Sequence, residues 1–296
     1  MPALYTLESK GYQSDTVSVP NKPKISEAEY WDKYYHYPEI VYEWNNGYLE
    51  EKPVSDHATY LSHNWFSHLL NHYLETKPVA ELTGLEIGFR LSLPQTVEIR
   101  RPDLGVVLNS NPVKLLPNDK SYKGTFDLCI EAISDSNPTD IKRDTIDKKA
   151  AYAKVGVTEY YILDGHDRYN EFYRLGKGGI YVPIKPVNGE IIQSTVLPGF
   201  QFRIADLFSK PSAKNMIDDL VYQSFVLPDY SKAKHHAQQA EQHAQQEKQA
   251  RQQAEQQAQQ EKWARQQAEQ QAQQEKQARQ RLADKLRSLG IDPDNI

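Results

Sequence analysis

The chain is poor in cysteine and has no long apolar segment. Its 296 residues include a single cysteine, Cys129, so a disulfide framework is excluded and the thiol is expected to be a reduced core residue. The N-terminal stretch lacks the basic and apolar regions of a signal peptide, and no apolar run approaches the length of a transmembrane helix. These absences predict a soluble, cytoplasmic protein without a membrane partner.

Positive charge is not in excess either. The 35 Lys and Arg residues are outnumbered by 40 Asp and Glu residues, giving a formal net charge of −5. Such a chain has no polybasic footprint, so any contact with nucleic acid must be local. Length and composition predict one folded domain with an appendage. The expected segments are an arm at 1–24, a domain at 25–209, a linker at 210–231, a long helix or coiled coil at 232–289 and a tail at 290–296.

The most informative part of the chain is a strand–helix–strand unit over residues 126–164. Residues 126–134 form a short apolar run that is typical of a buried strand. A helix is expected at 138–155, ended by Gly156, and a second strand at 158–163. The two strands are expected to run parallel, joined by a right-handed crossover.

One carboxylate, that of Glu131, interrupts the apolar strand. An ionised group there costs several kcal/mol unless it meets a cation or hydrogen-bond donors. Glu131 lies about 13 Å back from the turn at 3.3 Å per residue, and Lys148 lies roughly 14 Å into the returning helix at 1.5 Å per residue. Strand and helix therefore place the two side chains at the same level, which indicates an active site.

Further elements are expected on both sides of this unit. Ser26 predicts the cap of a short helix at 26–35, and the turn Asn45-Asn46-Gly47 predicts a β-hairpin at 41–50. The other expected elements are a helix at 57–74, strands at 82–93 and 97–108, a hairpin at 168–186 and a strand pair at 191–204. Together they predict an α/β fold whose core reads helix, strand, strand, strand, helix, strand, with extra hairpins.

The composition changes abruptly after residue 231. Residues 232–289 are nearly all Gln, Ala, Glu, Lys and Arg, and a 14-residue unit recurs from Glu241, Glu255 and Glu269. Fourteen residues are two heptads, the period of a left-handed supercoil. The repeat predicts a helix up to about 85 Å long. It is either a solvated single helix or a coiled coil that makes the protein a homo-oligomer, such as a dimer.

Several motifs together resemble the Uma-two family of bacterial endonucleases, which have the PD-(D/E)xK, restriction-endonuclease-like fold. The motifs are Arg101-Pro102-Asp103 on an expected strand, Glu131-Ala132-Ile133-Ser134, Lys148-x-x-x-Tyr152 and Gly156-Val157-x-Glu159-Tyr160. The resemblance spans about residues 25–208 and also includes Tyr42-Glu43, Asn46-Gly47, His57 and Pro198-Gly199-Phe200.

The resemblance implies metal-dependent hydrolysis of phosphodiester bonds in DNA. Asp103 and Glu131, on neighbouring strands, would hold Mg²⁺ or Mn²⁺ together with the Ala132 carbonyl, since these ions prefer oxygen ligands. The ion would lower the pKa of a bound water. Lys148 would orient that water or help to deprotonate it.

The resemblance also leaves alternatives open. Glu43 and His57 are expected to reach the site, although a lone histidine at a helix start is more often a cap or a surface residue. Ile133 stands where the wider superfamily has its lysine, so Lys148 must substitute for it from the helix. The neighbouring Lys149 is an alternative donor of that ammonium.

A different class of function is a nuclease fold without activity, acting as a scaffold through its tail. Asp103 would then cap a turn or pair with a neighbouring arginine, and Glu131 would be a buried salt-bridge carboxylate. Lys148 would pair with Asp144 on a solvated helix face. Because a decayed site would usually have lost one of Asp103, Glu131 and Lys148, the presence of all three favours the nuclease.

Overall fold

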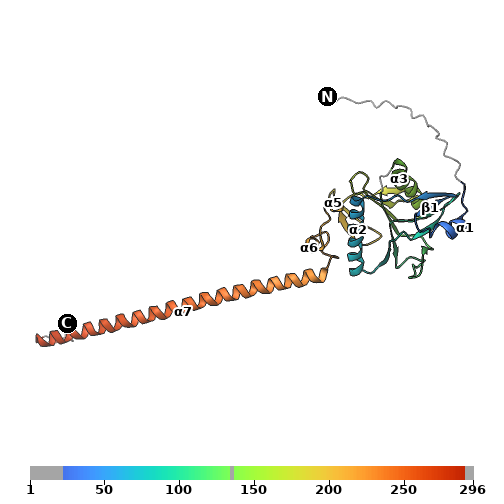
Figure 1. Cartoon of the computed structure of the whole chain (residues 1–296). Coiled ribbons are helices and arrows are strands. Elements are labelled where there is room, and N and C mark those ends of the chain that lie inside the picture. The colour runs from blue at the N-terminus through green and yellow to red at the C-terminus, as the bar shows by residue number, and fades with distance from the viewer. Residues whose placement is uncertain (1–22, 134–136, 291–296) are drawn as a thin grey trace, which may run out of the picture. The chain divides into compact units, whose positions relative to one another are not determined.

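The computed structural model describes residues 23–133 and 137–290 (Figure 1). The chain divides into a globular unit that ends at Pro228 and a second unit that begins at Asp229. The arm expected at 1–24 and the tail expected at 290–296 lie almost entirely outside the described residues. Residue 134, the expected end of the strand that carries Glu131, also lies outside them.

A six-stranded sheet in the order β11-β10-β9-β8-β6-β3 forms the centre of the globular unit. Its strands are β3 (Ala80–Thr83), β6 (Leu104–Leu108), β8 (Leu128–Ala132), β9 (Glu159–Leu163), β10 (Glu171–Leu175) and β11 (Tyr181–Pro183). The β8–β9 pair runs parallel and the other neighbours run antiparallel. The parallel pair joined by a crossover helix is therefore confirmed.

Helices cover both faces of this sheet. On one face lies α2 (His57–Thr76), whose apolar side chains recur at helical spacing and share a core with β6, β8 and β9. On the other face lies the β8–β9 connection, formed by α3 (Pro138–Lys142), the π-helical segment η2 (Arg143–Lys148) and α4 (Lys149–Val155). Gly156, with φ at 88°, ends that connection in the left-handed conformation that suits glycine. The helix expected at 138–155 is confirmed in extent, but its middle is π-helical.

A second sheet of five strands has the order β2-β1-β5-β4-β7. Its strands are β1 (Tyr42–Asn45), β2 (Tyr48–Glu51), β4 (Gly88–Ser92), β5 (Val97–Arg100) and β7 (Ser121–Tyr122). The hairpin predicted around Asn46-Gly47 is confirmed, since both residues have positive φ (47° and 101°), as a two-residue type I′ turn requires. A separate pair, β12 (Ile191–Gln193) with β13 (Gln201–Arg203), lies later in the chain.

A short N-terminal helix precedes the second sheet. It consists of α1 (Glu27–Glu29) and the π-helical η1 (Tyr30–Tyr34). The Ser26 hydroxyl accepts a hydrogen bond from the Glu29 backbone N–H at 3.1 Å, which confirms the predicted cap. An aromatic cluster that includes Tyr30 and Trp44 joins this helix to the sheet.

The prediction of two continuous strands, at 82–93 and 97–108, is wrong. Each divides in two, because the chain leaves one sheet for the other at residues 84–87 and returns at residues 101–103. Strands β4 and β5 are thus a hairpin inserted into the second sheet. Without it the order is α2, β3, β6, β8, α3–α4, β9, which confirms the predicted core. Asp103 consequently lies at the crossing between sheets, immediately before β6, and not within a strand.

The globular unit also extends beyond residue 209. Residues 210–231 were expected to be a linker, but Met216, Val221, Tyr222 and Phe225 are buried in the same core as α2. Two short helices, α5 (Asp206–Ser209) and α6 (Ala213–Met216), lie in this region. The linker prediction therefore fails as far as Pro228, because the apolar side chains of this segment are buried in the core of the globular unit.

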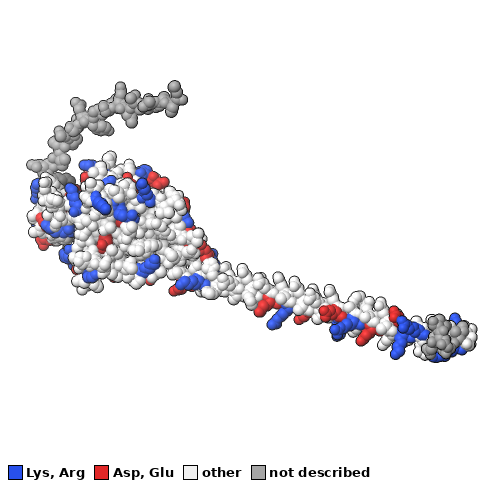
Figure 2. All heavy atoms as spheres, turned by 180° about the vertical axis from the view of Figure 1, so that it is seen from behind, with Lys and Arg blue, Asp and Glu red and all other residues white. Residues whose placement is uncertain are grey.

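The long C-terminal helix is confirmed as α7 (Pro228–Ser288), which contains 61 residues. At 1.5 Å per residue it is about 90 Å long. Acidic and basic side chains are interspersed along it, and most of its residues are exposed (Figure 2). None of the described helices combines the length and the apolar character needed to cross a bilayer. The coiled coil stays a prediction.

Candidate active site

The alternation of side chains along β8 determines where Glu131 points. Ile130 belongs to the core under α2, whereas Cys129 faces the opposite core beside α4. Glu131 shares the face of Cys129 and is 1% exposed. Its carboxylate accepts hydrogen bonds from two residues of the crossover helix, from Lys148 Nζ at 2.9 Å and from the Tyr152 hydroxyl at 2.8 Å.

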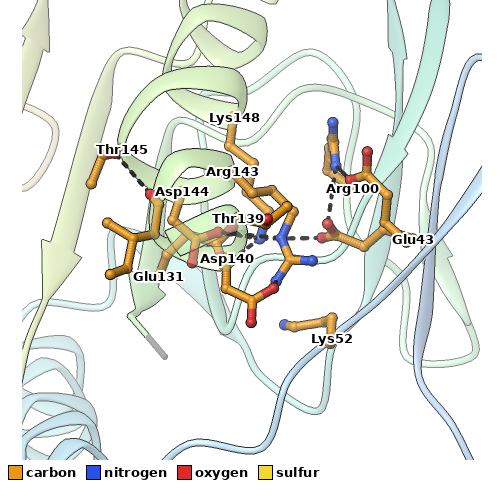
Figure 3. Close-up of polar contacts among 12 residues, drawn as sticks. Glu43, Lys52, Arg100, Glu131, Thr139, Asp140, Arg143, Asp144, Thr145 and Lys148 are labelled. Atoms are coloured by element: carbon orange, nitrogen blue, oxygen red, sulfur yellow. Dashed lines mark hydrogen bonds and ion pairs between the residues drawn. The ribbon is translucent and has the colours of Figure 1, made fainter. Parts of the chain in front are cut away.

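Lys148 is the centre of a buried ion network (Figure 3). Its ammonium lies 2.9 Å from Glu131, 3.0 Å from Asp144 and 3.3 Å from Glu43. Burial opposes its positive charge, but the three carboxylates outweigh burial and keep the pKa of Lys148 well above its ordinary value. The expected level match between Glu131 and Lys148 is thus observed as a direct contact.

The neighbouring lysine points elsewhere. Lys149 Nζ lies 4.4 Å from the centroid of the Tyr173 ring and donates to its hydroxyl at 3.1 Å. The structure therefore brings Lys148, and not Lys149, to Glu131. Lys148 belongs to η2 together with Asp144, and π-helical turns are frequent at functional sites.

Asp103 lies beside Glu131 across the β6–β8 pairing. The antiparallel register pairs Leu104 with Ile130, which brings Asp103 to the level of Glu131. Asp103 Oδ2 accepts a hydrogen bond from the Ala132 backbone N–H at 2.7 Å. The two carboxylates implied as metal ligands therefore come from adjacent strand ends, as expected.

Lys52 is a residue of this cluster that the sequence did not predict. Its backbone N–H donates to the Val41 carbonyl at 2.9 Å, which fixes it directly after β2. Its Nζ donates to Asp103 Oδ1 at 2.8 Å and to the Arg101 carbonyl at 2.7 Å. Burial opposes the charge of each partner, yet their mutual attraction outweighs it, so the pKa of Lys52 is raised and that of Asp103 is lowered.

Glu43 joins the network from β1 in the second sheet. It is fully buried, with Oε2 3.2 Å from Arg100 Nη1 and Oε1 accepting the Arg101 backbone N–H at 2.8 Å. Burial opposes ionisation, but the charges of Lys148 and Arg100 outweigh it and hold the pKa of Glu43 well below its usual range. Glu43 thus reaches the cluster, as the partner of two buried cations.

Glu131 has the opposite shift. Burial raises the pKa of Glu131 to about 8, because the charge of Lys148 opposes the effect of burial only in part and the charge of Asp103 adds to it. Both glutamates contact Lys148, but Glu43 also contacts Arg100, whereas Glu131 lies near the carboxylate of Asp103.

A cavity of about 380 Å³ opens beside Asp103. It is lined by Ser55, Tyr60, His63, Leu85, Glu86, Asp103 and Ala132. Glu131 is not among the lining residues and lies deeper in the wall, held by Lys148 and Tyr152. The cavity therefore gives access to Asp103 and Ala132 first.

His57 does not join the carboxylates. It is exposed at the start of α2, where its ring stacks on that of Tyr60 with centroids 6.1 Å apart, and the helix cap is Asp56. His63 of the same helix lines the cavity instead. Burial lowers the pKa of His63 against the charge of Asp103 and favours its neutral form.

The donors beside the cavity suit a hard divalent cation. The Asp103 and Glu131 carboxylates and the Ala132 carbonyl are oxygen donors, which Mg²⁺ and Mn²⁺ prefer. A cation, the Lys52 ammonium, already lies against Asp103, which shows that this position favours positive charge. Within the described parts of the chain, no group of three or more His, Cys, Asp or Glu side chains could hold a metal. Such an ion would therefore rest on two carboxylates, a carbonyl and water.

The same combination of fold and residues matches a known family. The family model of Uma2, described as "Putative restriction endonuclease", matches residues 29–205, more than half of the chain. The chain belongs to the Uma2 family. A search of curated proteins finds no match for this Uma2 protein.

A solved structure has a similar fold. It is the crystal structure of "a putative nuclease belonging to DUF820" from Anabaena variabilis ATCC 29413, with a TM-score of 0.50 and 16% sequence identity. The match covers 63% of this chain and 98% of the other. At this identity the likeness shows the fold alone, and it confirms the restriction-endonuclease-like α/β fold of this Uma2 protein. Family and fold together indicate a nuclease, a hydrolase that acts on nucleic acid.

Sequence reasoning missed several residues around Glu131. The i,i+4 spacing of Lys148 and Tyr152 could have identified Tyr152 as a second donor to Glu131, because both lie on one helix face. No comparable signal marks Arg100 or Lys52 in this Uma2 protein. Arg100 meets Glu43, and Lys52 meets Asp103, across more than 50 positions of the sequence and only through the pairing of the strands.

Proposed function

We propose that the chain is a divalent-metal-dependent endonuclease that hydrolyses phosphodiester bonds of DNA. The observation that carries the proposal is the adjacency of Asp103 and Glu131 at neighbouring strand ends beside a cavity. These carboxylates and the Ala132 carbonyl would hold Mg²⁺ or Mn²⁺. An ion bound there neutralises charge on the phosphate and lowers the pKa of a coordinated water.

Lys148 acts in this proposal through Glu131. Its ammonium is 1% exposed and enclosed by Glu43, Glu131 and Asp144, so its 2.9 Å contact fixes the place of Glu131. Tyr152 holds the other oxygen of the same carboxylate. Both are positioning residues. This role is narrower than that expected from the sequence, in which Lys148 orients or deprotonates the attacking water.

The partners follow from charge and from α7. A chain with a net charge of −5 offers DNA only a local contact surface. We propose that α7 associates with a second copy as a coiled coil, since two active sites per dimer suit cleavage of both strands. The free, buried Cys129 fits the reducing cytoplasm.

One observation favours a second function, a scaffold with a nuclease fold but no activity. The Lys52 ammonium already balances the charge of Asp103 at the point where a metal would bind. In that case Asp103 keeps Lys52 as its partner and binds no metal ion, and the function of the protein depends on α7.

Incubation of the purified protein with supercoiled plasmid and with single-stranded DNA separates the two functions. Cleavage that requires Mg²⁺ or Mn²⁺, stops with a chelator and is lost in Asp103→Ala supports the nuclease. Asp32→Ala is the control, since that aspartate is exposed on a helical segment and is not among the residues of the site. Absence of both cleavage and Mn²⁺ binding in the wild type selects the scaffold.

A further inference from the structure

The turn between β3 and β4 has an unusual backbone. Leu85 and Glu86 have φ of 52° and 59°, in the left-handed region that residues other than glycine, asparagine and aspartate seldom adopt. Arg101 Nε holds the turn by donating to the Glu86 carbonyl at 2.9 Å. Leu85 is 98% exposed. An apolar side chain held in solvent by a strained turn contributes nothing to the core, and such strain often marks a functional position.

This turn forms one wall of the cavity beside Asp103. Tyr60 of α2, 55% exposed, belongs to another wall. The cavity shares Asp103 and Ala132 with the proposed metal site, so whatever enters it lies next to the scissile phosphate. Its volume of about 380 Å³ falls within the range of sites for small organic groups.

The lining favours a nucleobase over a phosphate. The described residues that line it include the carboxylates of Asp103 and Glu86 and no lysine or arginine, so a phosphate fits only next to a metal ion at Asp103. The Tyr60 ring, by contrast, offers a surface on which a base can stack. Glu86 can accept a hydrogen bond from an exocyclic amino group. His63 Nε2 is buried and has no hydrogen-bond partner within the described residues, which leaves one further polar atom in this wall.

We propose that this cavity receives a nucleobase next to the scissile phosphate, with Tyr60 as its stacking surface and Leu85 as a wedge between neighbouring bases. The inference rests on the proposed function, because it requires the phosphate at Asp103. Apolar wedges that separate base steps are a known means of distorting DNA. Unstacking costs least for unpaired bases. The substrate class is therefore single-stranded or mismatched DNA in preference to a fully paired duplex.

The test uses Tyr60→Ala and Leu85→Asn in the full-length protein. Binding to fluorescent single-stranded, mismatched and fully paired oligonucleotides is measured by anisotropy in Ca²⁺, and thermal stability is measured on the same samples. Each variant should bind the single strand roughly fivefold to one hundredfold more weakly, as expected for the loss of one stacked base. Because asparagine tolerates the left-handed region, Leu85→Asn should melt at the wild-type temperature or above it.

Leu220→Asn is the matched control, since Leu220 is 80% exposed and does not line the cavity. It should bind DNA as the wild type does. If the wild type binds and cleaves DNA, and both Tyr60→Ala and Leu85→Asn bind the single strand as tightly as the wild type does, the nucleobase site is wrong. The proposed nuclease function would still stand. A wild type that neither binds nor cleaves any of the oligonucleotides would overturn the proposed function together with the nucleobase site.

Discussion

The ammonium of Lys52 lies 2.8 Å from Oδ1 of Asp103, so the carboxylate proposed to bind a divalent ion already holds a cation. Asp103 lies at the crossing between the two sheets, and Lys52 directly follows the β1–β2 hairpin of the second sheet. Two cations at one carboxylate oxygen repel each other strongly in a partly buried site. Lys52 is therefore expected to limit the affinity for the metal.

Replacing Lys52 with methionine should strengthen metal binding. Calorimetry should show Mn²⁺ affinity at least about tenfold higher in Lys52→Met, because the competing charge is removed. In chelator the same variant should melt at a lower temperature, since Asp103 loses its partner. Lys149→Met, whose ammonium contacts Tyr173, should leave both quantities unchanged. Weaker or unchanged Mn²⁺ binding in Lys52→Met would show that Lys52 does not compete with the ion.

Removing either proposed carboxylate ligand should abolish metal binding. Asp103→Ala and Glu131→Ala should each show no Mn²⁺ uptake by calorimetry, because one carboxylate and a carbonyl offer too few oxygen ligands. Asp32→Ala should bind like the wild type. Undiminished binding in both Asp103→Ala and Glu131→Ala would place the ion elsewhere in the protein.

Loss of Lys148 should destabilise the folded protein. Lys148→Ala leaves the buried carboxylates of Glu43, Glu131 and Asp144 without their shared ammonium. Breaking a buried ion network in this way costs about 3–5 kcal/mol in the free energy of unfolding. Urea denaturation measures this loss, and Lys149→Ala on the adjacent position should lose far less. Equal stability of the two variants would contradict the central role of Lys148.

Stability of the metal-free protein should depend on the protonation of Glu131. Its pKa is about 8 in the folded protein against 4.5 as the ordinary value, so the folded state binds the proton more tightly than the unfolded state. The stabilisation is therefore complete below pH 4.5 and is lost as the pH rises through 8. Melting temperatures in chelator across this range should fall more steeply for the wild type than for Glu131→Gln. Parallel curves would show that Glu131 ionises with its ordinary pKa.

Deleting residues 232–296 should leave a folded globular unit, because its core residues lie before Pro228. The melting temperature should therefore stay near that of the full chain. Sedimentation should show a smaller oligomer than the full-length protein forms. A full-length protein that is already monomeric at micromolar concentration would exclude the coiled coil and identify α7 as a spacer.

The parts predicted correctly from the sequence depend on residues close together in the chain. The Ser26 cap, the Asn46-Gly47 turn and the end of the crossover helix at Gly156 are local backbone preferences. The contact between Glu131 and Lys148 follows from the rise per residue along one strand and one helix. Each of these predictions required only local geometry.

The residues that were missed meet through the fold alone. Lys52 and Asp103 are 51 positions apart, and no periodic pattern connects them. The sequence predicts Asp103 within a strand, because the run at 97–108 shows no sign of the change from one sheet to the other. His63 reaches the cavity through the packing of α2, which its spacing from other histidines does not reveal.

The ion network also joins the two sheets, and this has an evolutionary consequence. Glu43 belongs to the second sheet, Glu131 to the first, and Lys148 contacts both. Selection for folding alone would retain these charges even in a lineage that had abandoned hydrolysis, so their survival does not measure activity. Asp103 lies outside this network, and its ion partner is Lys52. Inherited loss of catalysis is therefore expected to appear first around the cavity, with Asp103 and Lys52 lost together, in chains that still keep Glu43 and Lys148.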